Sequence, residues 1–108
     1  MKTLITMKWS GVTPAQLDQV NSLVNLETTD HKGMILHAAC FINENTLHVT
    51  DIWESVEDFN HFVQDRVMPA VAQAGFSSAP QIERFPIYDL FIPDTQQVIH
   101  RPTIANFY

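Results

Sequence analysis

The residues best suited to chemistry are His37, Asp51 and Trp53, which lie on two neighbouring segments of extended character. Antiparallel pairing of these segments would set His37 opposite Asp51 and Ile35 opposite Trp53, on the face of the sheet that also carries Val49. A histidine held by a carboxylate in an enclosed pocket could act as a base or orient a hydroxylated ligand. The structural alternative is a buried imidazole–carboxylate hydrogen bond at the centre of a dimer.

The register of this pairing depends on the turn that joins the two segments. A three-residue turn over residues 43–45 places His37 opposite Asp51. A two-residue turn over residues 44–45 sets His37 against Ile52 instead, because the side-chain period of a strand is two. The length of the turn therefore decides whether the predicted pair exists.

Cys40 and His48 form a second cross-strand pair in the same register, predicted on the helix-facing side of the sheet. A thiol beside an imidazole could carry out nucleophilic chemistry or begin a metal site. Two residues make neither a catalytic triad nor a closed coordination shell, and cysteine is commonly a small core residue. We therefore expect a packing role for this pair and no metal site. No cofactor is expected either, since the 3 glycines form no phosphate-binding loop.

Four further side chains are candidate ligand contacts: Trp9, Trp53, Arg66 and Tyr88. Arg66 could reach an anionic ligand at the mouth of a pocket, although such an arginine more often pairs with a nearby carboxylate. Tyr88 could point its phenol into the fold, or pack as an ordinary strand residue. The two tryptophans could line the pocket or simply fill the core.

Composition limits the classes of function. The chain has 108 residues, 12 acidic and 6 basic side chains and a formal net charge of −6, and no segment clusters basic residues, so nucleic acid is not an expected partner. No apolar run approaches the ~18 residues that span a bilayer, so no membrane segment is expected. The N-terminus does not resemble a signal peptide, and the single Cys40 cannot form an intramolecular disulfide. The cytoplasm is the expected location.

Hydrophobic periodicity predicts six elements, and these must position the candidate residues. Thr13 and Gln16 have the spacing of a capping box, Gly75 suits a helix C-terminus, and Pro69 predicts a kink within a turn of Asp65. Pro86 indicates an edge strand or a bulge. The elements are a strand over 2–8, a helix over 14–26, strands over 34–42 and 47–53, a helix over 56–74 and a strand over 81–90.

The order strand, helix, strand, strand, helix, strand predicts an α+β domain over residues 1–91. It is the ferredoxin-like βαββαβ arrangement, with two helices on one face of an antiparallel sheet. The strand over 34–42 is apolar on both faces, and Trp9, Val49 and Trp53 add to an apolar surface that two helices would not cover. We therefore expect a homodimer that packs sheet on sheet. Residues 92–108 are expected to dock as a tail on their own or on the partner subunit.

The chain also resembles a known family through Gly33–Ala38 (GMILHA), Asp51–Ser55 (DIWES), Phe59, Phe62, Arg66 and Pro69. It is similar to small bacterial proteins of the dimeric α+β barrel superfamily that are related to antibiotic-biosynthesis monooxygenases, over residues 1–91. The resemblance implies a barrel formed across a dimer, with a pocket between each sheet and its helices. Members include cofactor-free oxygenases acting on polycyclic phenols, haem-degrading enzymes, isomerases and proteins without known activity. The Asn-Trp-His set of the haem degraders has no match here.

Two functions fit these observations. The first is a cofactor-independent monooxygenase-like or isomerase-like enzyme acting on a small apolar, aromatic or enolisable molecule, with His37 and Asp51 as its polar groups. The second is a non-catalytic ligand-binding or stress-associated homodimeric barrel. A cavity that contains His37 and a polar partner would favour the first, and a fully packed interior the second. A purely structural module would be indicated if residues 104–108 filled the cavity mouth.

Overall fold

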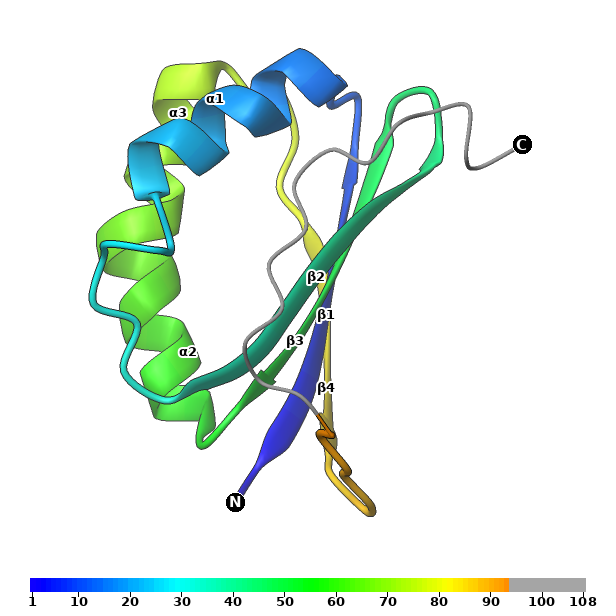
Figure 1. Ribbon diagram of the computed structural model, residues 1–108. Helices are drawn as coiled ribbons and strands as arrows, with labels where there is room; N and C mark the ends of the chain where they lie inside the picture. The colour runs from blue at the N-terminus through cyan, green and yellow to red at the C-terminus, as the bar shows by residue number, and fades with distance from the viewer. Residues whose placement is uncertain (94–108) are drawn as a thin grey trace.

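The computed structural model describes residues 1–93 and confirms the ferredoxin-like α+β fold (Figure 1). One four-stranded antiparallel sheet in the order β2-β3-β1-β4 carries the helices on one face. Residues 94–108, most of the predicted docking tail, lie outside the described part of the chain. The elements are β1 (Thr3–Ser10), α1 (Pro14–Val24), β2 (Met34–Asn43), β3 (Thr46–Trp53), α2 (Val56–Phe62), the π-helix η1 (Val63–Val67), α3 (Met68–Ala74) and β4 (Gln81–Pro86).

Helix α1 begins with the predicted capping box. The backbone N–H of Gln16 donates to Thr13 Oγ1 over 3.2 Å, and the backbone N–H of Thr13 donates to Gln16 Oε1 over 2.9 Å. Two of the free amides at the helix N-terminus are thereby satisfied. The helix ends at Asn25, whose left-handed φ of 47° stops it two residues before the expected boundary. The side-chain amide of Gln16 also donates to the carbonyl of Ala74, which ties α1 to the end of α3.

The second helical segment is interrupted as Pro69 predicts. Proline has no N–H, so the carbonyl of Asp65 lacks the donor that a regular α-helix would supply four residues later. The chain responds with the five-residue π-helix η1, in which the N–H of Met68 donates to the carbonyl of Val63. Helix α3 then ends at Gly75 in the predicted left-handed conformation, with φ 79°. No helix among residues 1–93 combines the length and the hydropathy needed to cross a membrane.

The two faces of the sheet differ from the prediction. Trp9, Val49 and Trp53 are all buried under the helices, at most 4% exposed, so they add nothing to the open face. The register places His37 and Asp51 on this same helix-facing side, and Cys40 and His48 on the opposite side. The prediction of the faces was therefore wrong. Strand β2 is apolar on both faces and could not decide the question, whereas the large side chains of β1 and β3 require the helices as cover.

On the open face, cross-strand neighbours form rows of different polarity. One row, Leu36, Ile52, Leu4 and Phe85, is apolar across all four strands. The two adjacent rows are mainly polar, comprising Ala38, Thr50, Thr6 and Glu83, then Cys40, His48, Lys8 and Gln81. The apolar surface that the helices leave uncovered is thus narrower than the sequence predicts. Strand β4 is an edge strand that ends at Pro86, as the proline indicates.

Candidate active site

The turn between β2 and β3 has two residues, yet His37 still lies opposite Asp51. Asn43 pairs with Thr46, and a register shift between Phe41 and Asn43 inserts one extra residue into β2. This bulge restores the register that the two-residue turn would otherwise have lost. The pairing of His37 with Asp51 is therefore confirmed through a geometry that neither predicted turn contained.

A second register shift changes the neighbour of Trp53. It lies between Met34 and Leu36, so that Trp53 pairs with Met34. The predicted pairing of Trp53 with Ile35 is wrong, because Ile35 is itself the extra residue of this second bulge and has no partner in β3. Two bulges thus frame the segment of β2 that carries His37.

His37, Asp51 and Trp53 form one hydrogen-bonded chain. The Nδ1 atom of His37 lies 2.7 Å from Asp51 Oδ1, and Trp53 Nε1 donates to Asp51 Oδ2 over 3.0 Å. Asp51 is only 3% exposed, so these two donors meet the need of a buried carboxylate for partners. A carboxylate accepts and does not donate, so the proton of this contact sits on His37 Nδ1. The other ring nitrogen, Nε2, is then free to accept a proton.

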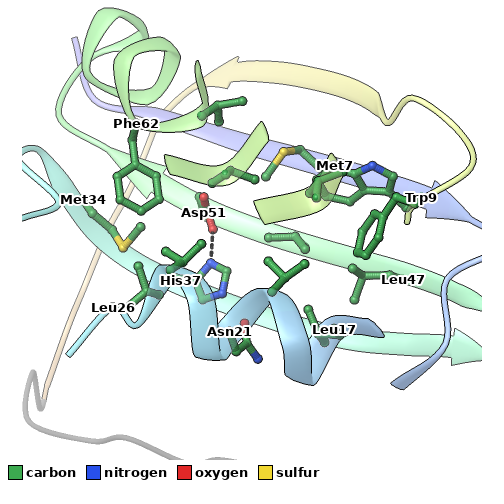
Figure 2. Close-up of a pocket in the computed structure, with 17 residues that line it drawn as sticks. Met7, Trp9, Leu17, Asn21, Leu26, Met34, His37, Leu47, Asp51 and Phe62 are labelled. Carbon is green, nitrogen blue, oxygen red and sulfur yellow. Dashed lines mark hydrogen bonds and ion pairs between the residues drawn. The ribbon is translucent and has the colours of Figure 1, made fainter. Parts of the chain in front are cut away.

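His37 and Asp51 face a cavity of about 60 Å³ between the sheet and the helices (Figure 2). The His37 side chain is 31% exposed and the Asp51 side chain 4%, so the histidine stands between the solvent and the buried acid. The walls are almost entirely apolar, formed by Met7, Trp9, Leu17, Val20, Val24, Leu26, Met34, Leu47, Val49, Phe62, Val63, Val67, Val71 and Phe76. Asn21 of α1 is the other polar side chain that residues 1–93 contribute to the lining.

The two tryptophans have different places. Trp53 is fully buried and packs against Phe59 and Phe62, with ring centroids 6.0 and 5.4 Å away, so it holds Asp51 from behind the cavity. Trp9 lines the cavity and packs edge to face against Phe76. The two ring centroids are 5.8 Å apart, and the angle between the ring planes is 85°. The buried Nε1 of Trp9 has no hydrogen-bond partner among residues 1–93.

Arg66 and Tyr88 do not join this site in the protomer. Arg66 is exposed on η1 and is absent from the lining of the cavity. The predicted last strand ends at Pro86, so Tyr88 follows it and its side chain is fully exposed. The prediction that Tyr88 lies on the strand is wrong, since Pro86 breaks the ladder before it. Arg84, which no prediction included, lies on the helix-facing side, 5.9 Å from the Phe59 ring.

Sequence reasoning missed Asn21, Val63 and Val67 as cavity residues. A signal for Asn21 was present, because it lies four residues after Leu17 and three before Val24, at the exposed edge of the inward stripe of α1. Nothing in the sequence marked the two valines as members of a π-helix apart from the nearby proline. Within the described residues no three of the side chains His, Cys, Asp and Glu gather as they would around a metal ion.

No protein-family description and no curated protein matches the chain, whereas solved structures do. A protein of unknown function from Nitrosomonas europaea is 20% identical, with a TM-score of 0.66 over 86% of this chain and 95% of its own. A putative antibiotic biosynthesis monooxygenase from Chloroflexus aurantiacus is 16% identical, with a TM-score of 0.62 over 85% and 99%.

SnoaB, a cofactor-independent oxygenase from Streptomyces nogalater, is also 16% identical, with a TM-score of 0.59 over 86% of this chain and 97% of its own. These identities show a common fold and carry no residue of a site from one protein to another. The protein thus has the ferredoxin-like α+β fold of the antibiotic-biosynthesis monooxygenases and resembles them in structure.

Proposed function

We propose that the protein is a cofactor-independent, monooxygenase-like or isomerase-like enzyme that removes a proton from a small phenol or enol. The observation that carries this proposal is the hydrogen-bonded chain of Trp53, Asp51 and His37 at an apolar cavity. Such a chain fixes the tautomer of a histidine and stabilises the imidazolium that forms when Nε2 accepts a proton. The fold shared with SnoaB supports the same class of reaction.

The chemistry begins with proton transfer to His37 Nε2 from an O–H or an acidified C–H of the ligand. The proton makes the ring an imidazolium, which pairs with Asp51. The electron pair of the broken O–H or C–H bond stays on the ligand, which becomes a phenolate or enolate. The apolar walls exclude water, which strengthens the attraction between the ion pair and the ligand anion. An anion of this kind can react with dioxygen, or take its proton back at another atom as an isomerase requires.

The size of the cavity limits the substrate. Its volume of about 60 Å³ is well below the roughly 150 Å³ of a cavity that encloses benzene. A polycyclic molecule therefore does not fit without movement of the helices. We propose a substrate that places only a small polar or unsaturated group inside, next to His37, and leaves its ring at the mouth of the cavity toward solvent.

Replacement of His37 tests the proposal. Phenol is the probe, its binding is followed by NMR titration, and oxygen uptake is measured over a panel of substituted phenols. His37→Gln removes the base but keeps a polar side chain, and we expect at least a tenfold loss of binding or turnover. His48→Gln is the matched control, because His48 lies on the opposite face of the sheet. Equal phenol binding by wild type and His37→Gln would overturn the proposal, and binding without turnover would point to the non-catalytic alternative.

The same proposal includes a homodimer that covers the open face of the sheet. The two ends of the apolar row support it, since Leu36 is 37% and Phe85 49% exposed in the protomer, whereas Ile52 between them is already 7% exposed. Sedimentation at micromolar concentration tests it: we expect a dimer for wild type and a monomer for Leu36→Lys. A monomeric wild-type protein would refute the proposed homodimer.

The cytoplasm, where thiols stay reduced, is the proposed location, consistent with the free Cys40.

A further inference from the structure

Asn21 is the one polar residue that α1 contributes to the cavity lining. Its helix neighbours in the lining, Leu17, Val20 and Val24, are apolar and form the stripe that faces the sheet. Asn21 itself is exposed, so it stands at the edge of that stripe, and asparagine has a poor helix propensity. Neither the cap nor the packing of α1 uses this side chain, since only the backbone carbonyl of Asn21 accepts a bond, from the N–H of Asn25.

The position of Asn21 relative to His37 is informative. In the view of Figure 2, Asn21 lies on the side of the His37 ring opposite Asp51, which is the side of the free Nε2. Both side chains line the same cavity and both are partly open to solvent, so they mark its mouth. Among residues 1–93 the side-chain amide of Asn21 has no hydrogen-bond partner. An exposed amide that lines the same cavity as the proposed base is available to a ligand.

We propose that Asn21 is a second ligand-binding residue and selects aromatic molecules that carry two oxygen substituents. This inference rests on the proposed function, in which the first oxygen or acidic group meets His37. The amide can donate through Nδ2 to a carbonyl or hydroxyl oxygen, and can accept a hydroxyl proton at Oδ1. It therefore binds a second oxygen whether that oxygen is oxidised to a ketone or present as a hydroxyl. The other unpaired donor that residues 1–93 contribute to the lining is the buried Nε1 of Trp9, which Figure 2 draws away from His37.

The test compares phenol with its three hydroxylated forms, catechol, resorcinol and hydroquinone, by NMR titration under anaerobic conditions. One additional hydrogen bond in a partly exposed site corresponds to roughly a 3- to 10-fold gain in affinity. We expect at least one of the three diols to exceed phenol by that factor on the wild-type protein. The isomer that does so also reports the spacing of the two oxygens.

Asn21→Ala then separates a binding role from a structural one. The variant is expected to bind phenol as the wild type does, to lose the preference for the diol, and to unfold at no lower denaturant concentration, because alanine has the higher helix propensity. Gln19→Ala is the matched control, an exposed amide on the same helix outside the cavity, and keeps the preference.

Each outcome decides between the two proposals. A diol preference that disappears in Asn21→Ala and survives in Gln19→Ala supports the inference. Equal affinity for phenol and all diols, or a preference that Asn21→Ala retains, overturns the inference and leaves the role of His37 standing. If none of the four molecules binds to the wild-type protein, the proposed function fails and the inference fails with it.

Discussion

Replacing Asp51 by asparagine should invert the tautomer of His37 while leaving the fold in place. The carboxylate accepts on both oxygens, from His37 over 2.7 Å and from Trp53 over 3.0 Å, whereas an amide has one oxygen and one NH2 group. Trp53 can only donate and its ring is fully buried, so the amide oxygen must face Trp53. The NH2 group then faces His37 Nδ1, which has to accept, and the ring proton moves to Nε2.

The energetic cost follows from the same contacts. Two hydrogen bonds to an ionised group, at about 1.5–3 kcal/mol each, become two neutral ones at about 0.5–1.5 kcal/mol each. The loss is offset in part because an amide is less costly to bury than a carboxylate at a position that is 3% exposed. We expect Asp51→Asn to lower the free energy of unfolding by about 1–2 kcal/mol, which corresponds to a fall in Tm of roughly 4–10 °C.

The assay is the pair of ring ¹⁵N chemical shifts of His37 in the neutral state, which distinguish a protonated nitrogen from one with a lone pair. Wild type should show the proton on Nδ1, and Asp51→Asn should show it on Nε2. His48, on the other face of the sheet, supplies an internal reference that should not change. A wild-type protein with the proton on Nε2, or a variant with an unchanged tautomer, would refute the reasoning and remove the free base from the proposed site.

Two further predictions concern the backbone around the cavity. Pro69→Ala restores the N–H that the carbonyl of Asp65 lacks, so η1 should become regular α-helix. The free energy of unfolding, measured by urea titration, should then rise by about 1 kcal/mol. A π-helix that NMR shows unchanged in the variant would mean that the proline is not its cause. Gly33→Ala should lower the free energy of unfolding by about 2–3 kcal/mol, because at φ 87° the added methyl group would lie 2.3 Å from Asp58 Oδ2. Gly75→Ala has no atom within 4 Å of the added methyl group and should lower it by only about 1 kcal/mol, through left-handed backbone strain. Equal losses for the two variants would contradict this prediction.

The order and type of the elements could be predicted from the sequence because each has a local signal. Thr13 and Gln16 specify the start of α1 through bonds that span three residues, and Pro69 breaks the second helix by removing a single N–H. Such signals require no knowledge of what packs against the element. The ferredoxin-like topology then follows from short connections and right-handed crossovers.

The faces of the sheet could not be predicted in the same way, because they depend on which side the helices occupy. Strand β2 is apolar on both sides, so its pattern fits either orientation. The deciding residues lie on β1, where Met7 and Trp9 are buried under the helices and alternate with the polar Thr6 and Lys8 of the open face. This alternation along β1, which β2 lacks, was the usable signal.

The pairing of His37 with Asp51 is correct in the sequence prediction, but the route to it differs. The prediction used a three-residue turn, while the protein combines a two-residue turn with a bulge at the end of β2. Both geometries leave the same number of residues unpaired between His37 and Asp51, so both give the same register. A bulge costs ladder hydrogen bonds that a longer turn would keep, and β2 has a second one on the other side of His37. Bulges re-aim side chains, and this pair lies on either side of His37, which faces the buried acid. The geometry of the site is therefore set by the two irregular positions of β2 as much as by the identity of His37 and Asp51.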